Sequence, residues 1–530
     1  MKRWFFSRKI AVFIGIAIGF MSMPHMIWVD SNGDNSLDFS PNGNVYYVSP
    51  TGNNSNPGTF SQPWATPSYG AQQLQPGDTL IILGGRYNLS TEDDIIILQD
   101  SGNQSNWITI KGETGNRPVL AGRDNLRAAI DISGKDYIMI ENIEITSDNG
   151  ALFRDGIEIL DAPASHIVLN EIYIHHIDEF GINIADVNGL QIVNSTISHC
   201  GFGCLGGPEG VQGGWRNVSL SGCSLLYSGW YYQGNYYNGP SEPDVSPYER
   251  PDGFGIEASN GPIEIVNCRV AFNLGDGIDS KANNTYIHEC IVANNRCDGV
   301  KLWGTGSRAV NTVIYGRGGG NMTPMPWSAV VIYTEHPGST FELTNLAIDD
   351  FVGENYLMHV QYDDPTIQIN LTVRNTIFCA RGQNTGIFVA GAVNLVMEHC
   401  LFYAPNCTDE VLVYGSTVYT ATQIGSLGAG NIYGDPMYVH PAVGVEGDYH
   451  VQIGSPAIDN GTATGAPSID LEGHLRPQGN GYDIGAYEYG SGVGEFSYGM
   501  ESWVSCAFFV VLLCLRCSSN LRKFLPLRRA

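Results

Sequence analysis

The chain has 530 residues, 43% of them hydrophobic and only 15% charged, and it contains 65 glycines. This length and apolar content predict a large folded protein, whereas the low charge and the many glycines exclude helical bundles and coiled coils, which leaves mainly β structure. The formal net charge is −26, and nine of the 27 basic residues lie within the two ends, 1–29 and 501–530. The acidic centre would repel phosphate backbones, so we expect no nucleic-acid partner.

Residues 1–29 are predicted to be a secretory signal peptide or an uncleaved signal anchor. Four lysines and arginines precede an apolar run, 10–23, which is the order of charge and hydrophobicity found in secretory signals. No small-residue cleavage motif is evident before Asp30, so both alternatives stay open. Either one predicts export, and the ten Asn-x-Ser/Thr sequons of the chain are compatible with a surface glycoprotein.

Residues 44–90 are predicted to form the N-terminal end of the fold. They contain the strand-like runs NVYYVSP and DTLIILGGRYN on either side of a helical segment, 65–74. A short amphipathic helix in this position would cover the open edges of the sheets that follow. We therefore predict an N-terminal capping helix.

An internal repeat organises the middle of the chain. Asp-Gly turns begin at Asp252, Asp276 and Asp298, at nearly equal spacing along the chain, and a similar unit begins at Asp155. Short segments with alternating apolar and polar residues follow these turns, such as IEIVNCRVAFN and TYIHECIVANN. Strands this short cannot bury a face alone and must stack on their neighbours. The repeat predicts an all-β protein, a parallel β-helix of about a dozen coils with about 22 residues per coil, over residues 44–430.

Cysteines recur at the ends of these segments and predict a stacked column. Cys200 and Cys223 are separated by close to one repeat, as are Cys268 and Cys290, and Cys400 closes a similar segment. Neighbouring coils lie about 4.8 Å apart. Cys268 and Cys290 are therefore either disulfide-bonded or stacked as small hydrophobic residues.

Beyond the repeats, residues 431–490 are predicted to form a C-terminal module, followed over 491–530 by a linker, a short hydrophobic anchor segment and a basic tail. The apolar run 503–515 is shorter than the roughly 20 residues that cross a bilayer as a helix, but five basic residues follow it, which is typical of the inner side of a membrane. We expect membrane contact through the terminal hydrophobic segments. Four acidic residues of the module could bind a cation or form an acidic structural turn: Asp459, Asp470, Asp483 and Glu488.

If the three Asp-Gly turns are in register, charged residues form columns across neighbouring coils. The third position after each aspartate holds Gly255, Asp279 and Lys301. The fifth position holds Glu257, Lys281 and Trp303. The columns would bring several carboxylates and two lysines into one patch.

This patch has two interpretations. Stacked carboxylates repel one another and need a cation, and calcium prefers clustered carboxylate oxygens, so the candidate calcium ligands are Asp252, Glu257, Asp276 and Asp279. Neutral Lys301 beside them could remove the C5 proton of a bound uronate. Alternatively, Asp-Gly is simply a favourable turn dipeptide, and the lysines are charge partners in a solvated ladder.

The runs PDGFGIEAS, NLGDGIDSK and DGVKLWG resemble the catalytic coils of the family 9 polysaccharide lyases. That family consists of calcium-dependent pectate lyases with a right-handed parallel β-helix fold. The resemblance implies that Asp252, Asp276 and Asp279 bind calcium and that Lys301 is the catalytic base.

Two positions depart from the pattern of that family. Gly275 stands where the first acid of a pair is usual, and Trp303 replaces a glycine after the base. The segment 455–489 is in turn similar to a C-terminal module found on many secreted β-helix proteins, which implies no activity.

Candidate substrate-binding residues lie around the predicted site. Lys281 and Trp303 belong to the fifth-position column. An insertion over residues 224–251 is rich in aromatic residues, including Trp230 and Tyr232. Aromatic rings offer stacking area for pyranose rings, and loops that leave a solenoid often bind ligands. The same rings could instead cover a hydrophobic wall of the solenoid.

The sequence as a whole therefore predicts a secreted or surface-anchored lyase that cleaves an acidic, uronate-containing polysaccharide by calcium-assisted β-elimination. Because both the protein and this polymer are acidic, binding would require a bridging metal ion. Two alternatives stay open: a non-catalytic cell-surface or carbohydrate-binding β-helix protein, and a uronate epimerase or glycoside hydrolase.

Overall fold

The computed structural model of the protein describes residues 43–123, 125–147, 153–236, 251–317, 328–351, 356–382 and 386–490. These residues all belong to one compact unit. The predicted signal segment, 1–29, and the predicted tail, 491–530, lie outside them. Within the described ranges, no helix has the length and apolar character needed to cross a membrane.

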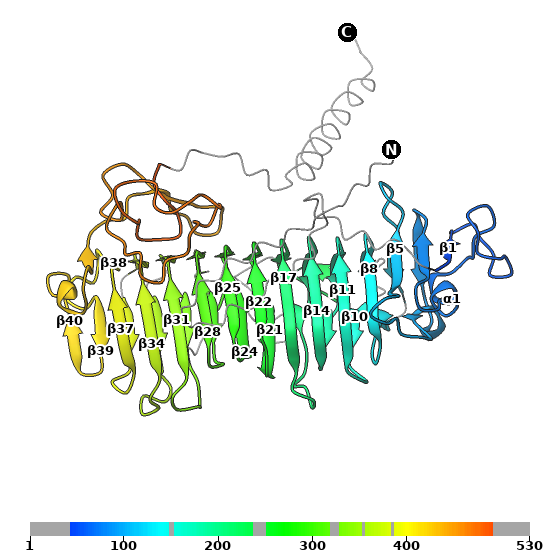
Figure 1. Ribbon diagram of the computed structural model, residues 1–530, viewed down its shortest axis with the longest axis horizontal. Helices are drawn as coiled ribbons and strands as arrows, with labels where there is room; N and C mark the ends of the chain where they lie inside the picture. Colours follow the sequence, from blue (N-terminus) through cyan, green and yellow to red (C-terminus); the bar gives the residue numbers. More distant parts are fainter. Residues whose placement is uncertain are drawn as a thin grey trace, which may run out of the picture. The chain divides into compact units, whose positions relative to one another are not determined.

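The described chain winds into three long sheets that run side by side along the molecule (Figure 1). Each coil gives one strand to each sheet: β11 (Ala164–Asn170) is followed by β12 (Tyr173–Ile177) and β13 (Phe180–Ile184), and β14 (Val187–Val193) then pairs with β11. We call the sheets that contain β11, β12 and β13 sheet 1, sheet 2 and sheet 3. The predicted parallel β-helix is confirmed.

The thirteen strands of each sheet follow in spatial order. Sheet 1 contains β1 (Val45–Val48), β2 (Thr79–Ile82), β5 (Ile108–Gly112), β8 (Asp136–Glu141), β11, β14, β17 (Trp215–Ser221), β22 (Ile263–Val266), β25 (Thr285–His288), β28 (Ser307–Val310), β31 (Thr340–Thr344), β34 (Asn370–Arg374) and β37 (Asn394–Glu398). Sheet 2 contains β3 (Arg86–Leu89), β6 (Val119–Gly122), β9 (Glu144–Ser147), β12, β15 (Thr196–Cys200), β18 (Ser224–Leu226), β23 (Arg269–Ala271), β26 (Ile291–Ala293), β29 (Val313–Tyr315), β32 (Ala347–Asp350), β35 (Ile377–Ala380), β38 (Leu401–Tyr403) and β41 (Ile432–Tyr433). Sheet 3 contains β4 (Ile96–Ile97), β7 (Leu126–Asp131), β10 (Phe153–Ile159), β13, β16 (Gly203–Gly206), β21 (Asp252–Ser259), β24 (Ile278–Ala282), β27 (Val300–Leu302), β30 (Val330–Ile332), β33 (Met358–Val360), β36 (Ile387–Val389), β39 (Leu412–Tyr414) and β40 (Thr417–Tyr419), of which the last two are antiparallel.

Among the described residues, helical structure is confined to short pieces: α1 (Pro67–Ala71), η1 (Glu92–Asp94) and η2 (Ile424–Ser426). The helix expected over 65–74 is thus a single turn, which begins after Thr66, whose hydroxyl accepts a hydrogen bond from the Tyr69 N–H. Ala71 and Leu74 are fully buried against the first strands. The capping role of this segment stays a prediction.

The interior of the solenoid is filled by columns of aliphatic residues. In sheet 1, Ile140, Leu169, Ile192, Leu220 and Ile265 lie in register on successive strands, and each is at most 1% exposed. Full burial of one such side chain contributes about 1.5–3 kcal/mol. The short alternating segments of the sequence therefore become stable only when the coils stack.

The corner between sheets 1 and 2 requires a left-handed backbone conformation. Asn194, Asn267, Asn311, Asn345 and Asn375 occupy this corner in different coils, with φ between 42° and 53°. Asparagine tolerates this region better than most residues other than glycine. The corner thus explains part of the asparagine content of the chain.

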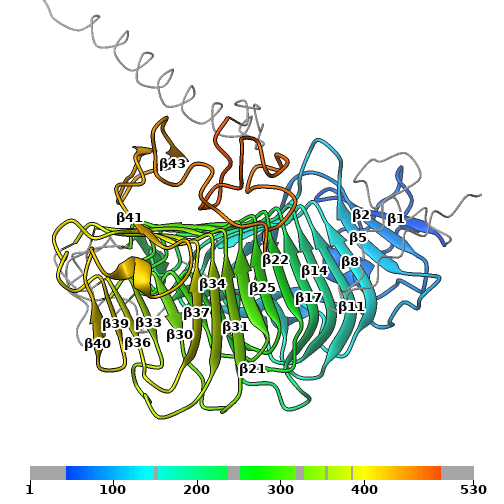
Figure 2. The same ribbon diagram turned by 60° about the vertical axis from the view of Figure 1, so that its left-hand side comes forward.

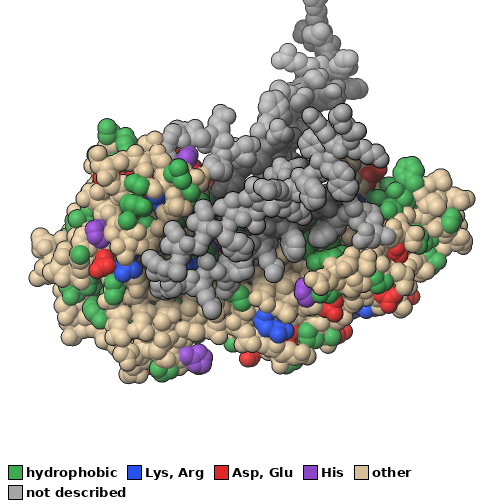
Figure 3. All heavy atoms as spheres, viewed as in Figure 1, with side chains coloured by type: hydrophobic (Ala, Val, Ile, Leu, Met, Phe, Trp, Pro, Cys, Tyr) green, Lys and Arg blue, Asp and Glu red, His purple; other side chains and the backbone are tan. Residues whose placement is uncertain are grey.

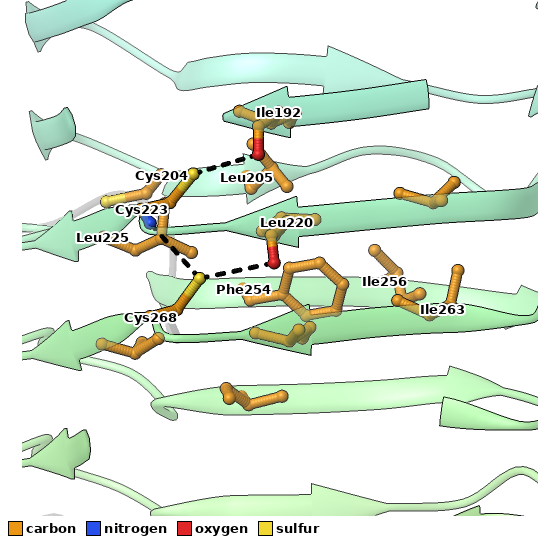
Figure 4. Packing of buried hydrophobic residues seen from close by; sticks show 14 of the residues in the cluster. Ile192, Cys204, Leu205, Leu220, Cys223, Leu225, Phe254, Ile256, Ile263 and Cys268 are labelled. Carbon is orange, nitrogen blue, oxygen red and sulfur yellow. Dashed lines mark hydrogen bonds between the residues drawn. The ribbon is translucent and has the colours of Figure 1, made fainter. Parts of the chain in front are cut away.

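The described cysteines are all free, so Cys268 and Cys290 are stacked and not disulfide-bonded. Figure 4 shows how they pack: the thiol of Cys223 donates to the Ile192 carbonyl at 3.3 Å, and that of Cys268 donates to the Leu220 carbonyl at 3.7 Å. Buried thiols in this column therefore behave as small apolar groups with a weak donor.

The predicted place of Cys200 in this column was wrong. Cys200 lies at the end of β15, in register with Ile177 in sheet 2. Ser195 occupies the corner position in that coil, because Thr196 is in register with Ser224. The spacing from Cys200 to Cys223 matched one repeat only because Cys200 lies beyond the corner of a coil that takes 28 residues to return from Thr196 to its register partner Ser224.

The C-terminal module lies over the outer face of sheet 2 (Figure 2). It contains β42 (Tyr438–His440), β43 (Asp448–Val451) and loops. Corner asparagines of the solenoid bind the module through hydrogen bonds. Asn375 donates from Nδ2 to the Thr462 carbonyl and accepts the Thr462 N–H at Oδ1, both at 2.8 Å. Asn345 Nδ2 donates to the Gly485 carbonyl at 3.0 Å. A second apolar cluster fills the interface, with Ala271, Ala293, Val313, Tyr315, Ala347, Ile377, Cys379 and Leu401 from the solenoid and Tyr438, Tyr449, Val451, Ala457, Leu471, Ile484 and Ala486 from the module.

The acidic residues of the module accept hydrogen bonds from backbone N–H groups and from an arginine. Asp470 accepts the N–H groups of Glu472, His474 and Glu488 at 2.9–3.1 Å. Asp483 accepts the N–H of Asp459 at 2.7 Å. These contacts support the acidic structural turn and not the cation site.

His450 gives the module a predicted dependence on pH. Burial lowers the pKa of His450, but hydrogen bonds and charges from Glu472 and Asp448 outweigh burial and raise the pKa to about 9. A raised histidine pKa stabilises the folded state fully below the unfolded value of about 6.5, and this contribution is lost as pH rises through 9. Urea denaturation between pH 6.5 and 9.5 should therefore show a stability advantage of the wild type over His450→Gln that shrinks with pH. An advantage independent of pH would contradict this assignment.

Candidate functional site

Charged side chains are scattered over the face shown in Figure 3, in keeping with the low charged content of the chain. The predicted site brings several charged side chains together on sheet 3. Gly255, Asp279 and Lys301 are in register on β21, β24 and β27. This confirms the third-position column, in which Asp279 and Lys301 lie side by side.

The aspartates of the Asp-Gly turns form a hydrogen-bonded ladder at the corner between sheets 2 and 3. Asp252 Oδ1 accepts the Asp276 N–H at 2.7 Å, Asp276 Oδ1 accepts the Asp298 N–H at 2.8 Å, and Asp298 Oδ1 accepts the Ser328 N–H at 2.6 Å. Each carboxylate thus satisfies the backbone of the next coil with one oxygen. The second oxygen of each remains available for the site.

Lys301 lies among carboxylate oxygens of the ladder and of Asp279. Its Nζ is 3.6 Å from Asp276 Oδ2, 3.7 Å from Asp298 Oδ2 and 3.9 Å from Asp279 Oδ2, and its side chain is 12% exposed. Burial alone lowers the pKa of Lys301, but the surrounding carboxylates, led by Asp276, raise it well above its usual range. In this arrangement Lys301 is protonated and acts as the counter-charge of the cluster.

The same environment disfavours ionised carboxylates. Burial and the charge of Asp276 raise the pKa of both Asp252 and Asp298 well above the usual range. For Asp279, burial is the largest cause and raises the pKa to about 6, although Lys301 opposes it. Full ionisation of these carboxylates would thus give the cluster more negative charge than one lysine balances.

Three of the four predicted metal ligands fit a cation. Asp252, Asp276 and Asp279 each offer a carboxylate oxygen, and these oxygens lie within 4.8 Å of one another. Asp279 Oδ1 is buried without a hydrogen-bond partner. Hard carboxylate oxygens are the donors that calcium prefers. The residues present are therefore suited to hold calcium.

Glu257 is not brought into this group. Its side chain is 46% exposed, and its Oε1 accepts a hydrogen bond from Lys281 Nζ at 2.8 Å. The register between β21 and β24 shifts after Ile256, which displaces the fifth position of β21. Lys281 therefore links Glu257 to the edge of the site, 4.0 Å from Asp279 Oδ2.

Trp303 forms one wall of the site. The ammonium groups of Lys301 and Lys281 lie 5.3 Å and 5.8 Å from the centroid of its ring, which meets Tyr333 edge to face at 4.7 Å. A cation near an aromatic face is attracted by the ring quadrupole. The fifth-position column thus places Lys281 and Trp303 beside the predicted base.

Two glycines leave space for the side chain of Asp252. A Cβ atom at Gly275 would lie 2.3 Å from Asp252 Oδ1, and one at Gly255 would lie 2.6 Å from Asp252 Oδ2. An acid at position 275 would therefore require the Asp252 carboxylate to move. Gly275, which departs from the pattern of the family 9 lyases, is a packing requirement of this arrangement.

The described rings Trp230 and Tyr232 of the aromatic insertion contact residues other than Lys301. Trp230 donates its indole N–H to the Phe272 carbonyl at 2.6 Å, and Tyr232 stacks on Phe202 at 5.9 Å. The short strands β19 (Tyr231–Tyr232) and β20 (Asn235–Tyr236) form a hairpin that contacts β12 and β15 of sheet 2. Residues 237–250 of the insertion lie outside the described part.

Sequence reasoning did not identify two residues that continue the columns of the site. Ser328 follows Asp298 and His359 lies two strands beyond Lys301 in the same column, since Val331 is in register with both. Ser328 Oγ is 3.1 Å from His359 Nδ1. Burial lowers the pKa of His359 to about 4, so the ring is neutral at neutral pH. Neither residue follows an Asp-Gly turn, and thus the repeat gave no signal for them.

Comparisons with known proteins agree with the fold. Residues 46–203 match the family model described as Pel9A-like, right handed beta helix region. The chain is therefore a right-handed parallel β-helix protein that resembles the Pel9A-like family, as the sequence predicted. The matched residues end before Asp252, so they contain no residue of the site. No curated protein shows significant sequence similarity to the chain.

The chain is also similar in fold to solved structures. The complex of XylC with xylose is 11% identical, with 84% of this chain and 98% of that chain covered and a TM-score of 0.56. Pectate lyase Pel9A is 15% identical over 84% of this chain and 96% of that chain, with a TM-score of 0.43. The A-module of the mannuronan C-5 epimerase AlgE6 from Azotobacter vinelandii is 13% identical over 68% and 91%, with a TM-score of 0.47. Because the sequence identity to XylC is so low, the likeness to it shows a shared fold only.

Proposed function

We propose that the protein is a secreted or surface-anchored polysaccharide lyase that cleaves an acidic, uronate-containing polysaccharide by β-elimination. The observation that carries this proposal is the position of Lys301, which lies within 4 Å of three carboxylates, beside the oxygen group of Asp252, Asp276 and Asp279. The predicted signal segment and basic tail support export and membrane attachment.

In this reaction Lys301 accepts the proton from C5 of the uronate. The electron pair of the broken C–H bond forms the double bond between C4 and C5, and the glycosidic oxygen leaves from C4 with its electron pair and takes up a proton. Bound calcium, held by Asp252, Asp276 and Asp279, would supply positive charge that binds the substrate carboxylate, acidifies the C5 proton and offsets the carboxylate field that keeps Lys301 protonated.

The neighbours of Lys301 hold the substrate in place. Trp303 offers a ring face beside Lys301, and Lys281 presents a partly exposed ammonium group that can pair with a second uronate carboxylate. Both residues come from the column that adjoins the base, so one polymer chain can contact all three at once.

The alternative of a non-catalytic carbohydrate-binding protein has one specific observation in its favour. The carboxylates hold Lys301 protonated, and a protonated lysine cannot remove a proton. The proposal therefore requires a cation at the site during the reaction.

An absorbance assay tests the proposed function. The full-length protein is mixed with pectate, alginate and other uronate polymers in calcium or in chelator, and the ultraviolet absorbance of the unsaturated uronate is followed. We expect the absorbance of the wild type to rise only in calcium. The Asp279→Asn variant should give no rise, because the substitution replaces a negatively charged carboxylate at the metal site by a neutral amide. A flat trace on every polymer from folded protein would favour the non-catalytic alternative.

A further inference from the structure

A second charged cluster lies on sheet 3, towards the N-terminal end from Lys301. Its residues come from β7, β10 and β13, and we call it the distal cluster: Arg127, Asp131, Arg154, Asp155, Glu158 and Asn183. Asp131, Glu158 and Asn183 are in register. The column continues through Gly206 and Gly255 to Asp279, so the distal cluster and the candidate site share one face of the sheet.

Two buried oxygens of the distal cluster have no hydrogen-bond donor. Glu158 Oε2 and Asn183 Oδ1 lack partners, although these residues are only 2% and 7% exposed. Asn183 uses its Nδ2 to donate to Asp155 Oδ2 at 2.9 Å, and Arg154 stays 3.8 Å from Glu158 Oε2. A buried acceptor without a donor is costly. Two of them at adjacent register positions indicate a ligand that brings hydroxyl or amine donors.

The charges of the cluster favour sugar hydroxyls over a metal ion. Arg127 donates to Asp131 Oδ2 at 2.8 Å and also pairs with Glu158, so a guanidinium group already occupies the carboxylates. Among the described residues, the group that brings three carboxylate oxygens close enough for one ion is in the candidate site and not here. Carboxylate, amide and guanidinium groups together can both accept from and donate to the hydroxyls of a sugar ring.

Two glycines lie between the two sites in this column of sheet 3. Glu158 and Lys301 are five strand spacings apart, about 24 Å at 4.8 Å per strand. Gly206 and Gly255 occupy the intervening column positions, and a Cβ at Gly206 would lie only 2.7 Å from the Gly255 carbonyl oxygen. The Phe180 ring lies beside Gly206 and the Asp252 carboxylate beside Gly255, so a chain of sugars that runs from one site to the other would pass over these two side chains.

We propose that the distal cluster is a second sugar-binding subsite, which holds hydroxyl groups of the same polysaccharide chain that reaches Lys301. This inference rests on the proposed function for the chemistry at Lys301, but not for binding at the distal cluster. It predicts that the protein selects long chains, because a disaccharide or trisaccharide is too short to contact both sites.

Binding measurements test the subsite without relying on turnover. Pectate and alginate, each as the polymer and as the trisaccharide, are titrated calorimetrically into the full-length protein that carries Lys301→Met. Addition of Asn183→Leu or Glu158→Gln should weaken polymer binding roughly tenfold, the size of effect expected for the loss of one hydrogen bond. The ratio of polymer affinity to trisaccharide affinity should fall with it. Asn370→Leu, an exposed substitution on sheet 1, serves as the matched control.

Each remaining outcome decides against one of the two proposals. Unchanged polymer binding in both variants, or no polymer binding before them, overturns the subsite. A calcium-induced rise in melting temperature that survives Asp279→Asn and disappears with Glu158→Gln would identify a cation site and overturn it as well. If the two substitutions weaken polymer binding but the wild type has no lyase activity, the subsite stands and the proposed lyase function is rejected. If the wild type has lyase activity but the two substitutions leave polymer binding unchanged, the lyase function stands and the subsite is rejected. Asn183→Leu keeps the ion pair of Arg127 and Glu158 but removes the hydrogen bond to Asp155, whereas Glu158→Gln keeps that hydrogen bond and removes the ion pair, so weaker binding in both folded variants separates binding from folding.

Discussion

Replacement of Lys301 by methionine is expected to slow β-elimination by about 10²–10⁴-fold, the usual contribution of a positioned general base. Methionine keeps most of the side-chain volume, so the walls formed by Trp303 and the aspartates should persist. The rate is measured by ultraviolet absorbance at saturating substrate with calcium present. Lys281→Met should instead mainly raise KM, because Lys281 lies at the edge of the site and pairs with Glu257.

The same variant should reveal the charge balance of the site. Without the ammonium group of Lys301, the carboxylates of Asp276, Asp279 and Asp298 lose their shared counter-charge. Lys301→Met should therefore melt at a lower temperature than the wild type in chelator and gain more from calcium. Lys135→Met, whose Nζ contacts only the Gln99 carbonyl among the contacts described, is the control. A rate within a few-fold of the wild type would exclude Lys301 as the base.

Replacement of Arg476 by methionine is expected to cost about 3–5 kcal/mol of stability, the usual result of breaking a buried ion pair. The Arg476 side chain is 0% exposed and pairs with Glu488 Oε1 at 2.6 Å. It also donates to the Asn311 side chain at 3.1 Å and to the Gly485 and Ala486 carbonyls at 3.0 and 2.8 Å. Methionine would leave the buried Glu488 carboxylate without the counter-charge of Arg476 and would remove one donor from each of the other three acceptors.

Urea denaturation measures this loss, and limited proteolysis shows whether the C-terminal module detaches from sheet 2. Arg308→Met is the matched control, since Arg308 lies on the surface of sheet 1 over the ring of Tyr286. We expect it to change stability by less than about 1 kcal/mol. A similarly small effect of Arg476→Met would show that the module contributes little to the fold.

The repeat made the architecture and the centre of the site predictable. Identical Asp-Gly turns at a nearly constant spacing set the same register in neighbouring coils, so Asp279 and Lys301 had to be adjacent. The resemblance to family 9 lyases then assigned roles to residues that the register had already brought together.

Other parts of the site depend on features that a repeat pattern does not encode. The register shift after Ile256 moves Glu257 away, and no residue type marks it in advance. Gly275 became understandable only from the position of the Asp252 carboxylate. Ser328 and His359 continue the columns without an Asp-Gly turn. The distal cluster begins at a unit seen in the sequence, Asp155, but Arg127, Asp131 and Asn183 come from neighbouring coils.

The C-terminal module changes how this solenoid should fold and unfold. Coils of a solenoid contact mainly their neighbours, so such proteins can lose structure from the ends, one repeat at a time. The module crosses several coils and joins Asn311, Asn345 and Asn375 to residues 87 to 165 positions later in the chain. The coils beneath it should therefore open together as one cooperative block, whereas the coils nearer the N-terminus can fray singly. Because the module is synthesised after every coil that it covers, this cooperativity arises only once the chain has been made through residue 490.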